Sequence, residues 1–222
     1  MSFLTAETDL SLDTLAKSVL ILGAPYSGGW ESLVQAVIQS VQSGKRVYCL
    51  DGKGEWLAKP SPAPEIRIRK LSKVPEKFPP VFPAGELQVI PVYETKANTG
   101  LAQLLIKGDK EIGGADLLLF SRVTSAIALR WYMAFLRAAD DWKEHTQIVL
   151  YQDAFHDAYL PLIPHCDEMI VFPHDAGPEL QSALLAGMVS KEEFDQMPTR
   201  HFLRIPDPYH TFTVQGSGSA LT

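Results

Sequence analysis

A turn near the start of the sequence has the glycine spacing of a phosphate-binding loop. The segment from Leu20 to Ser32 reads LILGAPYSGGWES, with Gly23 and Gly28 separated by four residues. In the motif G-x-x-x-x-G-K-[ST], backbone N–H groups converge on a phosphate at the N-terminus of the following helix. We therefore take the loop and first helical turn as a candidate nucleotide-binding site: Gly23, Ser27, Gly28, Gly29, Trp30, Glu31 and Ser32.

The side chains that handle phosphate in such a loop are absent. Gly29 stands at the lysine position of the motif, and Trp30 stands where a hydroxyl would bind Mg²⁺. Glu31 adds a negative charge to the first turn, where it satisfies the helix dipole and competes with a phosphate. Without the lysine, the loop does not stabilise the charge of phosphoryl transfer. The aromatic side chains of Tyr26 and Trp30 are predicted to fill the vacated pocket or to form an interface.

Alternating strand and helix patterns predict a mostly parallel α/β sheet around this loop. Apolar runs typical of buried strands lie at residues 18–24, 46–51, 87–93, 115–121, 147–153 and 167–173. Helical spacing of apolar residues predicts helices at 30–44, 99–107, 124–142 and 179–187, and a short one from residue 190. We expect a short turn to join 147–153 to 167–173. The segments HFLRIP and HTFTVQ predict a C-terminal β-hairpin.

A proline-rich, basic segment at residues 52–85 interrupts the alternation. We interpret it as an irregular insertion with a short edge strand at EIRIR, because proline removes backbone donors. Its cations Arg67, Arg69, Lys70 and Lys73 predict a solvated face, with contact to the phosphates of DNA as the alternative. We expect one domain over residues 1–215 and a flexible tail over 216–222.

Composition excludes some classes of protein. The formal net charge of −6 over 222 residues argues against broad coating of nucleic acid. Cys49 and Cys166 are too few for a disulfide framework and predict buried thiols in a reducing compartment. His156, His165 and His174 match no compact zinc spacing, so no metal site is predicted. No apolar run spans a bilayer, so we expect a soluble protein, cytoplasmic or virion-associated.

The order of motifs beyond the loop resembles the FtsK–HerA class of P-loop ATPases, above all the small genome-packaging ATPases of membrane-containing viruses. LDGKGEW at Leu50–Trp56 is similar to the D-x-K-G-E-like turn after the second strand of that family. ADLLLFSRV falls at the Walker B position, and IVLYQDAFHDAYLPLIPHCDEMIVF resembles the sensor strand and the segment after it, with Gln152 at the sensor position. The resemblance implies a three-layer RecA/FtsK-like P-loop sheet with helices on both faces.

The chain departs from this family at its catalytic residues. Ser121 and Arg122 stand where an acidic pair would hold Mg²⁺ and activate water, and Asp116 lies at the wrong end of that strand. Lysine, hydroxyl and both acids are therefore missing together. We expect a protein with degenerate Walker A and Walker B motifs that no longer hydrolyses ATP. It would be a structural or assembly component of a virion or DNA-packaging complex, pairing with itself or with an active ATPase paralogue.

Two other functions stay open, so whether the chain is an enzyme is undecided. An active DNA-translocating ATPase with an unorthodox loop would use ATP and Mg²⁺, with Gln152 as a catalytic sensor and a replacement cation from Lys17, Lys53 or a neighbouring subunit. A binding module would hold a nucleotide or another anion at the helix N-terminus of Gly28 and Gly29 without turnover.

Overall fold

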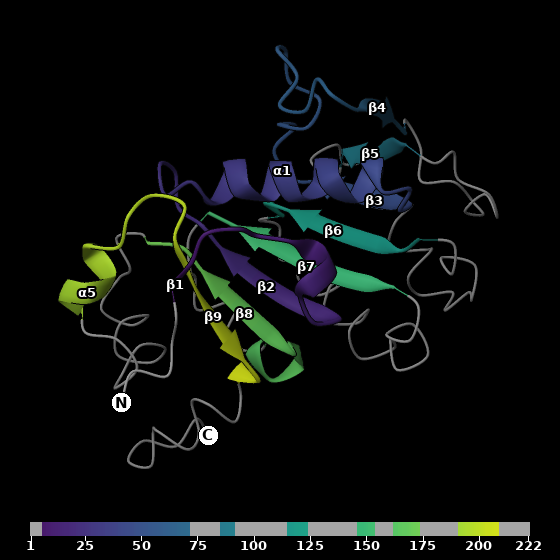
Figure 1. The fold of residues 1–222 in the computed structure, drawn as a ribbon. Helices are drawn as coiled ribbons and strands as arrows, with labels where there is room; N and C mark the ends of the chain where they lie inside the picture. Colours follow the sequence, from purple (N-terminus) through teal and green to yellow (C-terminus); the bar gives the residue numbers. More distant parts are fainter. Residues whose placement is uncertain are drawn as a thin grey trace.

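The computed structural model describes residues 6–71, 85–91, 115–123, 146–153, 162–173 and 191–208, whose strands form one nine-stranded sheet (Figure 1). The strand order is β1-β9-β8-β2-β7-β6-β3-β5-β4. The strands are β1 (Ala6–Glu7), β2 (Ser18–Leu22), β3 (Val47–Asp51), β4 (Arg67–Lys70), β5 (Glu86–Pro91), β6 (Leu117–Ser121), β7 (Gln147–Gln152), β8 (Glu168–Val171) and β9 (Phe202–Pro206). The described helices include η1 (Leu12–Thr14, 3₁₀), α1 (Gly29–Gln42) and α5 (Lys191–Asp195).

The sheet is mostly parallel, which confirms the predicted α/β class. Every neighbouring pair from β8 to β4 is parallel, whereas β9 is antiparallel to both β8 and β1. The first arm of the predicted C-terminal hairpin is present as β9, and its described partners are β8 and β1. The other predicted arm, at 210–215, lies outside the described residues, as do Lys73, the tail and the predicted helices at 99–107, 124–142 and 179–187.

The prediction of a short turn between β7 and β8 is wrong. β2 lies between them, with Leu22 paired to Gln152 on one side and to Val171 on the other. Two parallel strands that flank a third cannot be joined by a tight turn, because the chain must return to the same end of the sheet. This order brings the end of β7 beside the loop that follows β2.

Helix α1 covers one face of the sheet and fixes the position of the loop (Figure 1). Leu33, Val37 and Val41 recur at helical spacing and are fully buried in the core with the strands. Each such side chain contributes roughly 1.5–3 kcal/mol of hydrophobic stabilisation. The helix starts at Gly29, directly after Gly28, whose φ of 83° is left-handed and favours glycine.

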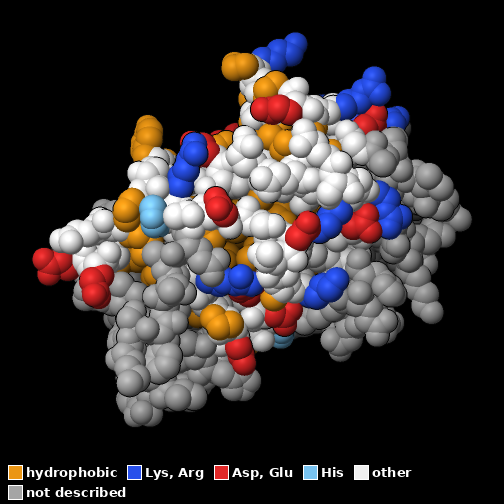
Figure 2. Space-filling model, viewed as in Figure 1, with side chains coloured by type: hydrophobic (Ala, Val, Ile, Leu, Met, Phe, Trp, Pro, Cys, Tyr) orange, Lys and Arg blue, Asp and Glu red, His pale blue; other side chains and the backbone are white. Residues whose placement is uncertain are grey.

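Strand β4 ends the sheet and confirms the edge strand predicted within EIRIR. It pairs in parallel with β5, and Ile68 packs against the core. Side chains alternate along a strand, so Arg67 and Arg69 point to the opposite face from Ile68. Figure 2 shows Lys and Arg side chains gathered at this end of the molecule, with acidic side chains among them.

The described part of the chain also bears on three predictions from composition. Cys49 and Cys166 are both buried thiols outside any disulfide, as predicted, and burial raises the pKa of the Cys49 thiol. Within the described ranges, no group of His, Cys, Asp or Glu side chains is arranged to hold a metal ion. No helix among these residues has the length and apolar character to cross a membrane.

Candidate functional site

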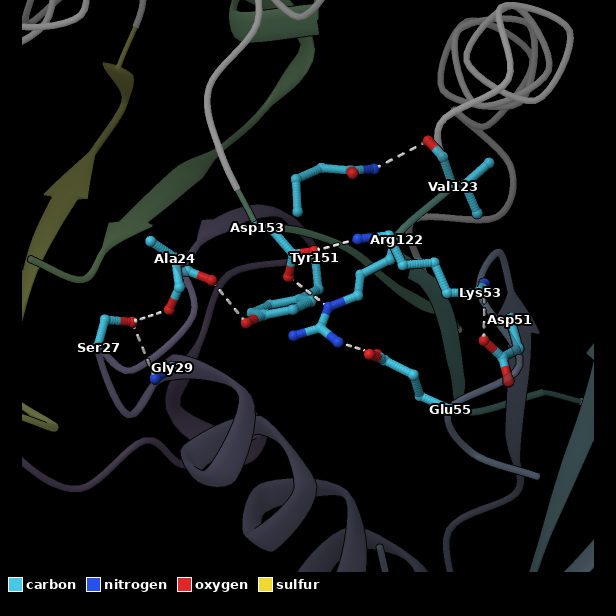
Figure 3. A network of polar contacts seen from close by, with 12 residues as sticks. Ala24, Ser27, Gly29, Asp51, Lys53, Glu55, Arg122, Val123, Tyr151 and Asp153 are labelled. Atoms are coloured by element: carbon cyan, nitrogen blue, oxygen red, sulfur yellow. Dashed lines mark hydrogen bonds and ion pairs between the residues drawn. The ribbon is translucent and has the colours of Figure 1, made fainter. Parts of the chain in front are cut away.

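The loop between β2 and α1 is closed by its own hydrogen bonds (Figure 3). The Ser27 hydroxyl donates to the Ala24 carbonyl at 2.7 Å and accepts from the Gly29 N–H at 3.2 Å. The Gly29 N–H is one of the groups that a phosphate-binding loop presents to its ligand. Here that donor already has a partner inside the loop.

Strand β7 anchors the first glycine of the loop. The Gly23 N–H donates to the Gln152 carbonyl at 2.9 Å, and the Tyr151 hydroxyl donates to the Gly23 carbonyl at 2.8 Å. Burial raises the pKa of Tyr151 to about 12, so this hydroxyl stays protonated at neutral pH and remains a donor. Both the N–H and the carbonyl of Gly23 are therefore hydrogen-bonded to residues of β7, which fixes the loop backbone at this point.

The lysine position of the motif is tightly packed. A Cβ atom on Gly29 would lie 3.0 Å from the Gly23 Cα and 3.0 Å from Cδ2 of Phe172. Protein interiors are close-packed, so a side chain at this position requires the backbone of Gly23 or the Phe172 ring to move. Glycine at position 29 is therefore part of a fitted contact between the loop and the residue that follows β8.

The turn before β9 packs on the second glycine of the loop. A Cβ atom on Gly28 would lie 2.6 Å from Cγ of Arg200 and 2.9 Å from its backbone nitrogen. The Arg200 N–H donates to the Ser27 carbonyl at 2.9 Å. Arg200 itself has a left-handed φ of 69°, as does Tyr26 in the loop with 70°. Left-handed backbone at non-glycine residues is costly and is retained where the surroundings enforce it.

Arg122, which directly follows β6, places its guanidinium inside the site (Figure 3). The residue is only 7% exposed. Its guanidinium forms ion pairs with Glu55 and Asp153. Its Cζ lies 4.5 Å from the ring centroid of Trp30 and 5.4 Å from that of Tyr151, within the range of cation–π attraction. A buried cation held by two carboxylates and two rings therefore lies at the end of β6, where the resemblance predicted an acidic pair.

The LDGKGEW turn supplies part of this cluster. The buried Asp51 carboxylate accepts hydrogen bonds from the N–H groups of Lys53, Gly54 and Trp56, at 3.2, 2.8 and 3.1 Å. Burial raises the pKa of Asp51, while these N–H groups and the charge of Arg122 oppose that rise. The capped turn directs Glu55 to the guanidinium.

Asp153 joins the turn to the end of β7. Its Oδ2 lies 2.5 Å from Nζ of Lys53, while Oδ1 pairs with Arg122. Lys53, considered above as a replacement for the loop lysine, is therefore engaged by a carboxylate. The two cations and two carboxylates Glu55 and Asp153 form a charge-balanced network.

The two aromatic residues of the loop differ in exposure. Trp30 packs edge-on against the buried Trp56 with ring centroids 5.1 Å apart, and lies 5.8 Å from Tyr151. The motif's hydroxyl position therefore carries a ring in contact with other aromatic side chains. Tyr26 is 96% exposed, so it remains available for contact with another molecule.

The remaining predicted site residues lie at the rim or behind the cluster. Gln152 is buried at the end of β7, and its side-chain amide donates to the Val123 carbonyl at 3.1 Å. Glu31 is exposed on the first helical turn. Ser32 donates its backbone N–H to the Gly28 carbonyl at 2.9 Å. The structure thus brings the predicted residues to one end of the parallel strands, and a catalytic role for Gln152 stays a prediction.

Glu55, Trp56, Tyr151 and Asp153 are the members of the cluster that sequence reasoning missed. The signal that could have found them is Arg122 itself, because a cation at the end of a buried strand must find counter-ions. The acidic residues that follow β3 and β7 were the candidates, since the ends of parallel strands meet at one edge of the sheet.

Comparison with known proteins gives structural matches only. No protein-family model and no curated protein sequence matches the chain. The genome-packaging NTPase B204 from Sulfolobus turreted icosahedral virus 2, in complex with AMP, is 13% identical and has a TM-score of 0.58, over 90% of this chain and 94% of that chain. Its complex with ATP-gammaS is 11% identical, with a TM-score of 0.55 over 87% and 93%. Its sulfate complex is 14% identical, with a TM-score of 0.54 over 86% and 91%. The chain therefore has the P-loop NTPase fold, as predicted.

Proposed function

We propose that this chain is a P-loop NTPase-like protein that does not hydrolyse ATP and serves as a structural or assembly component. The observation that carries the proposal is the guanidinium of Arg122 at the Walker B position. Mg²⁺ prefers oxygen ligands in octahedral geometry. The motif positions that would provide them carry the indole of Trp30, a single hydroxyl at Ser121 and the positive charge of Arg122, with no carboxylate among them, so these residues do not fit the metal.

The tightly packed lysine position supports the same proposal. Phosphoryl transfer depends on positioned positive charge around the transferred group. Gly29 leaves no room for a side chain without movement of Phe172 or Gly23. The nearby cations Lys53 and Arg122 are both neutralised by carboxylates within the protein.

The proposed setting rests on the fold. The matched solved structures are those of a viral genome-packaging NTPase. We infer a role within a virion or a DNA-packaging complex, in which the chain assembles with itself or with an active P-loop ATPase.

The direct test measures ATP binding and phosphate release in the presence of Mg²⁺. We expect no binding heat in isothermal titration and no phosphate release above that of a Gln152→Ala variant. Phosphate release that Gln152→Ala abolishes would instead establish an active ATPase with an unorthodox loop and overturn the proposal.

A second candidate function, binding of a nucleotide or anion without turnover, is supported by the preserved backbone of the loop. Gly28 keeps its left-handed conformation, and α1 begins directly after it. A ligand at one hundred times its Kd stabilises a protein by about 2.7 kcal/mol. A rise in Tm with ATP, ADP or inorganic phosphate, without phosphate release, would favour this function over the first.

A further inference from the structure

The Arg122 guanidinium connects separate segments of the chain that meet at the loop. It contacts Trp30 on α1, Glu55 in the turn after β3, and Tyr151 and Asp153 at the end of β7. Arg122 itself follows β6. One side chain thus joins, through charge and ring contacts, the elements whose relative positions define the site.

The backbone of Arg122 fixes the direction of this side chain. Its φ of 51° is left-handed, and its N–H donates to the Tyr151 carbonyl at 2.8 Å. The Arg122 carbonyl lies against Gly52. The Gly52 N–H donates to the carbonyl of Ser121, the residue before Arg122, at 2.8 Å. A left-handed arginine is strained, so the surrounding contacts must hold it. The buried guanidinium is therefore a fixed part of the fold.

We propose that Arg122 acts as a permanent internal substitute for an exchangeable ligand, so that the loop and strand ends keep one conformation at any nucleotide concentration. A bound ligand shifts a conformational equilibrium according to its concentration and its differential affinity. A group that belongs to the chain has a constant effective concentration. This inference deepens the proposed function, because it assumes that nucleotide does not occupy the site.

The first test removes the guanidinium by the substitution Arg122→Ala and then adds free guanidinium ion to the solution. Removing one partner of a buried ion pair leaves uncompensated charge, so Arg122→Ala is expected to lower Tm by about 6–20 °C. Low-millimolar guanidinium chloride should restore part of this loss in a saturable way, whereas equal concentrations of NaCl or urea should not. The rings and carboxylates of the emptied site supply the specificity.

Arg46→Ala is the matched control. Arg46 makes two side-chain bonds to Asp116, both at 2.9 Å, but its side chain is 35% exposed. Its variant should lose less stability and should gain nothing specific from guanidinium. The inference is overturned if guanidinium fails to restore Arg122→Ala, or if it restores both variants equally.

A second measurement uses the unaltered protein, in case Arg122→Ala does not fold. The Nε–H of Arg122 should exchange with solvent far more slowly in NMR than that of Arg67, whose side chain is 79% exposed. Addition of Mg²⁺ and ATP should leave this exchange unchanged. Fast exchange, or a change with nucleotide, contradicts the inference. Phosphate release would instead contradict the proposed function. The inference is therefore tested by Nε–H exchange and the proposed function by phosphate release.

Discussion

Gly52 follows β3 and lies directly against the carbonyl of Arg122. A Cβ atom on Gly52 would lie 2.6 Å from the Arg122 carbonyl carbon, closer still to its oxygen, and 2.8 Å from the Val123 Cα. These neighbours are backbone atoms, so they cannot move aside as a flexible side chain could. Glycine is required at position 52 because there is no space for a Cβ atom, whereas many other glycines are required for a positive φ.

Gly52→Ala should therefore destabilise the protein by about 3 kcal/mol or more, at the upper end of overpacking costs. Denaturant titration followed by circular dichroism measures this change. Gly44→Ala is the control, because a Cβ there meets nothing within 4 Å and only its left-handed φ of 90° is strained. A cost at Gly52 no larger than that at Gly44 would contradict the described contact.

Restoring the lysine and the hydroxyl residue of the phosphate-binding motif should not restore ATP binding. Gly29→Lys forces a side chain against Phe172, and Trp30→Ser removes the ring under the Arg122 guanidinium. We expect the double variant to have a lower Tm than the original chain and no ATP binding in isothermal titration. Binding of ATP by the double variant would show that packing at Gly29 yields and that only the chemistry had been lost.

The Arg46–Asp116 pair should stabilise the protein near neutral pH and lose this effect in acid. The bond from Arg46 is the largest cause that lowers the pKa of Asp116 below its usual 3.8. A depressed carboxyl pKa contributes stability above the unfolded value, and this contribution is lost as the pH falls through the folded value. Asp116→Asn should thus lower Tm by a constant amount near neutral pH, with the difference shrinking below about pH 4. Thermal melts over pH 2–7 check this, and a difference that does not shrink contradicts it.

At the scale of elements, strand β4 concentrates positive charge at one end of the sheet. Arg67, Arg69 and Lys70 line a surface hollow together with Ile68 and Glu86. Arg67 pairs with Glu86 at 3.0 Å, and its side chain is still 79% exposed. Cations in such an arrangement suit a chain of phosphates.

We propose that this hollow contacts the DNA backbone, and the double variant Arg67→Gln/Arg69→Gln tests it. Each lost phosphate contact should reduce the slope of log K against log salt by about 0.9 for duplex DNA, hence by about 2 for both. Fluorescence anisotropy with labelled DNA over a range of NaCl concentrations measures the slope. Lys59→Gln, which removes an exposed cation outside β4, serves as the control. If the slope of log K against log salt were the same for the two variants, β4 would be a solvated edge strand that does not contact DNA.

The elements were easier to predict from sequence than the contacts between them. β2, β3, β6 and β7 are buried along their whole length, so their apolar runs stand out within a residue or two. The short turn expected between β7 and β8 failed because neighbours in sequence need not be neighbours in a parallel sheet. The Arg122 cluster was missed for a related reason, since Glu55 and Asp153 follow different strands and meet the arginine only after folding.

At the scale of the whole molecule, the loop presents one aromatic side chain outward. Tyr26 is the exposed large hydrophobic residue found within the described ranges, and its left-handed backbone belongs to a loop held by internal bonds. Tyrosine on a rigid support is a frequent anchor of protein interfaces, since it contributes contact area at low entropic cost.

We expect self-assembly to depend on this residue. Light scattering after size exclusion should give the original chain a mass above the 24.5 kDa of one copy, and Tyr26→Ser should shift the mass toward that value. Glu192→Gln, at an exposed position of α5, should leave the mass unchanged. A single-copy mass for the original chain would contradict self-assembly and leave assembly with an ATPase paralogue to be tested by mixing.

The fitted contacts around Arg122 also restrict the routes that evolution can take from this sequence. Substitution of Trp30 alone removes the ring beneath a buried cation, and Arg122→Asp alone places a carboxylate beside Glu55 and Asp153. Substitution of Gly29 alone by lysine meets Phe172. Residues in contact do not contribute additively, so a combination that works as a set can be reached only through less stable single steps. Building the complete phosphate-binding and acidic motifs into this sequence would therefore have to pass through less stable single variants.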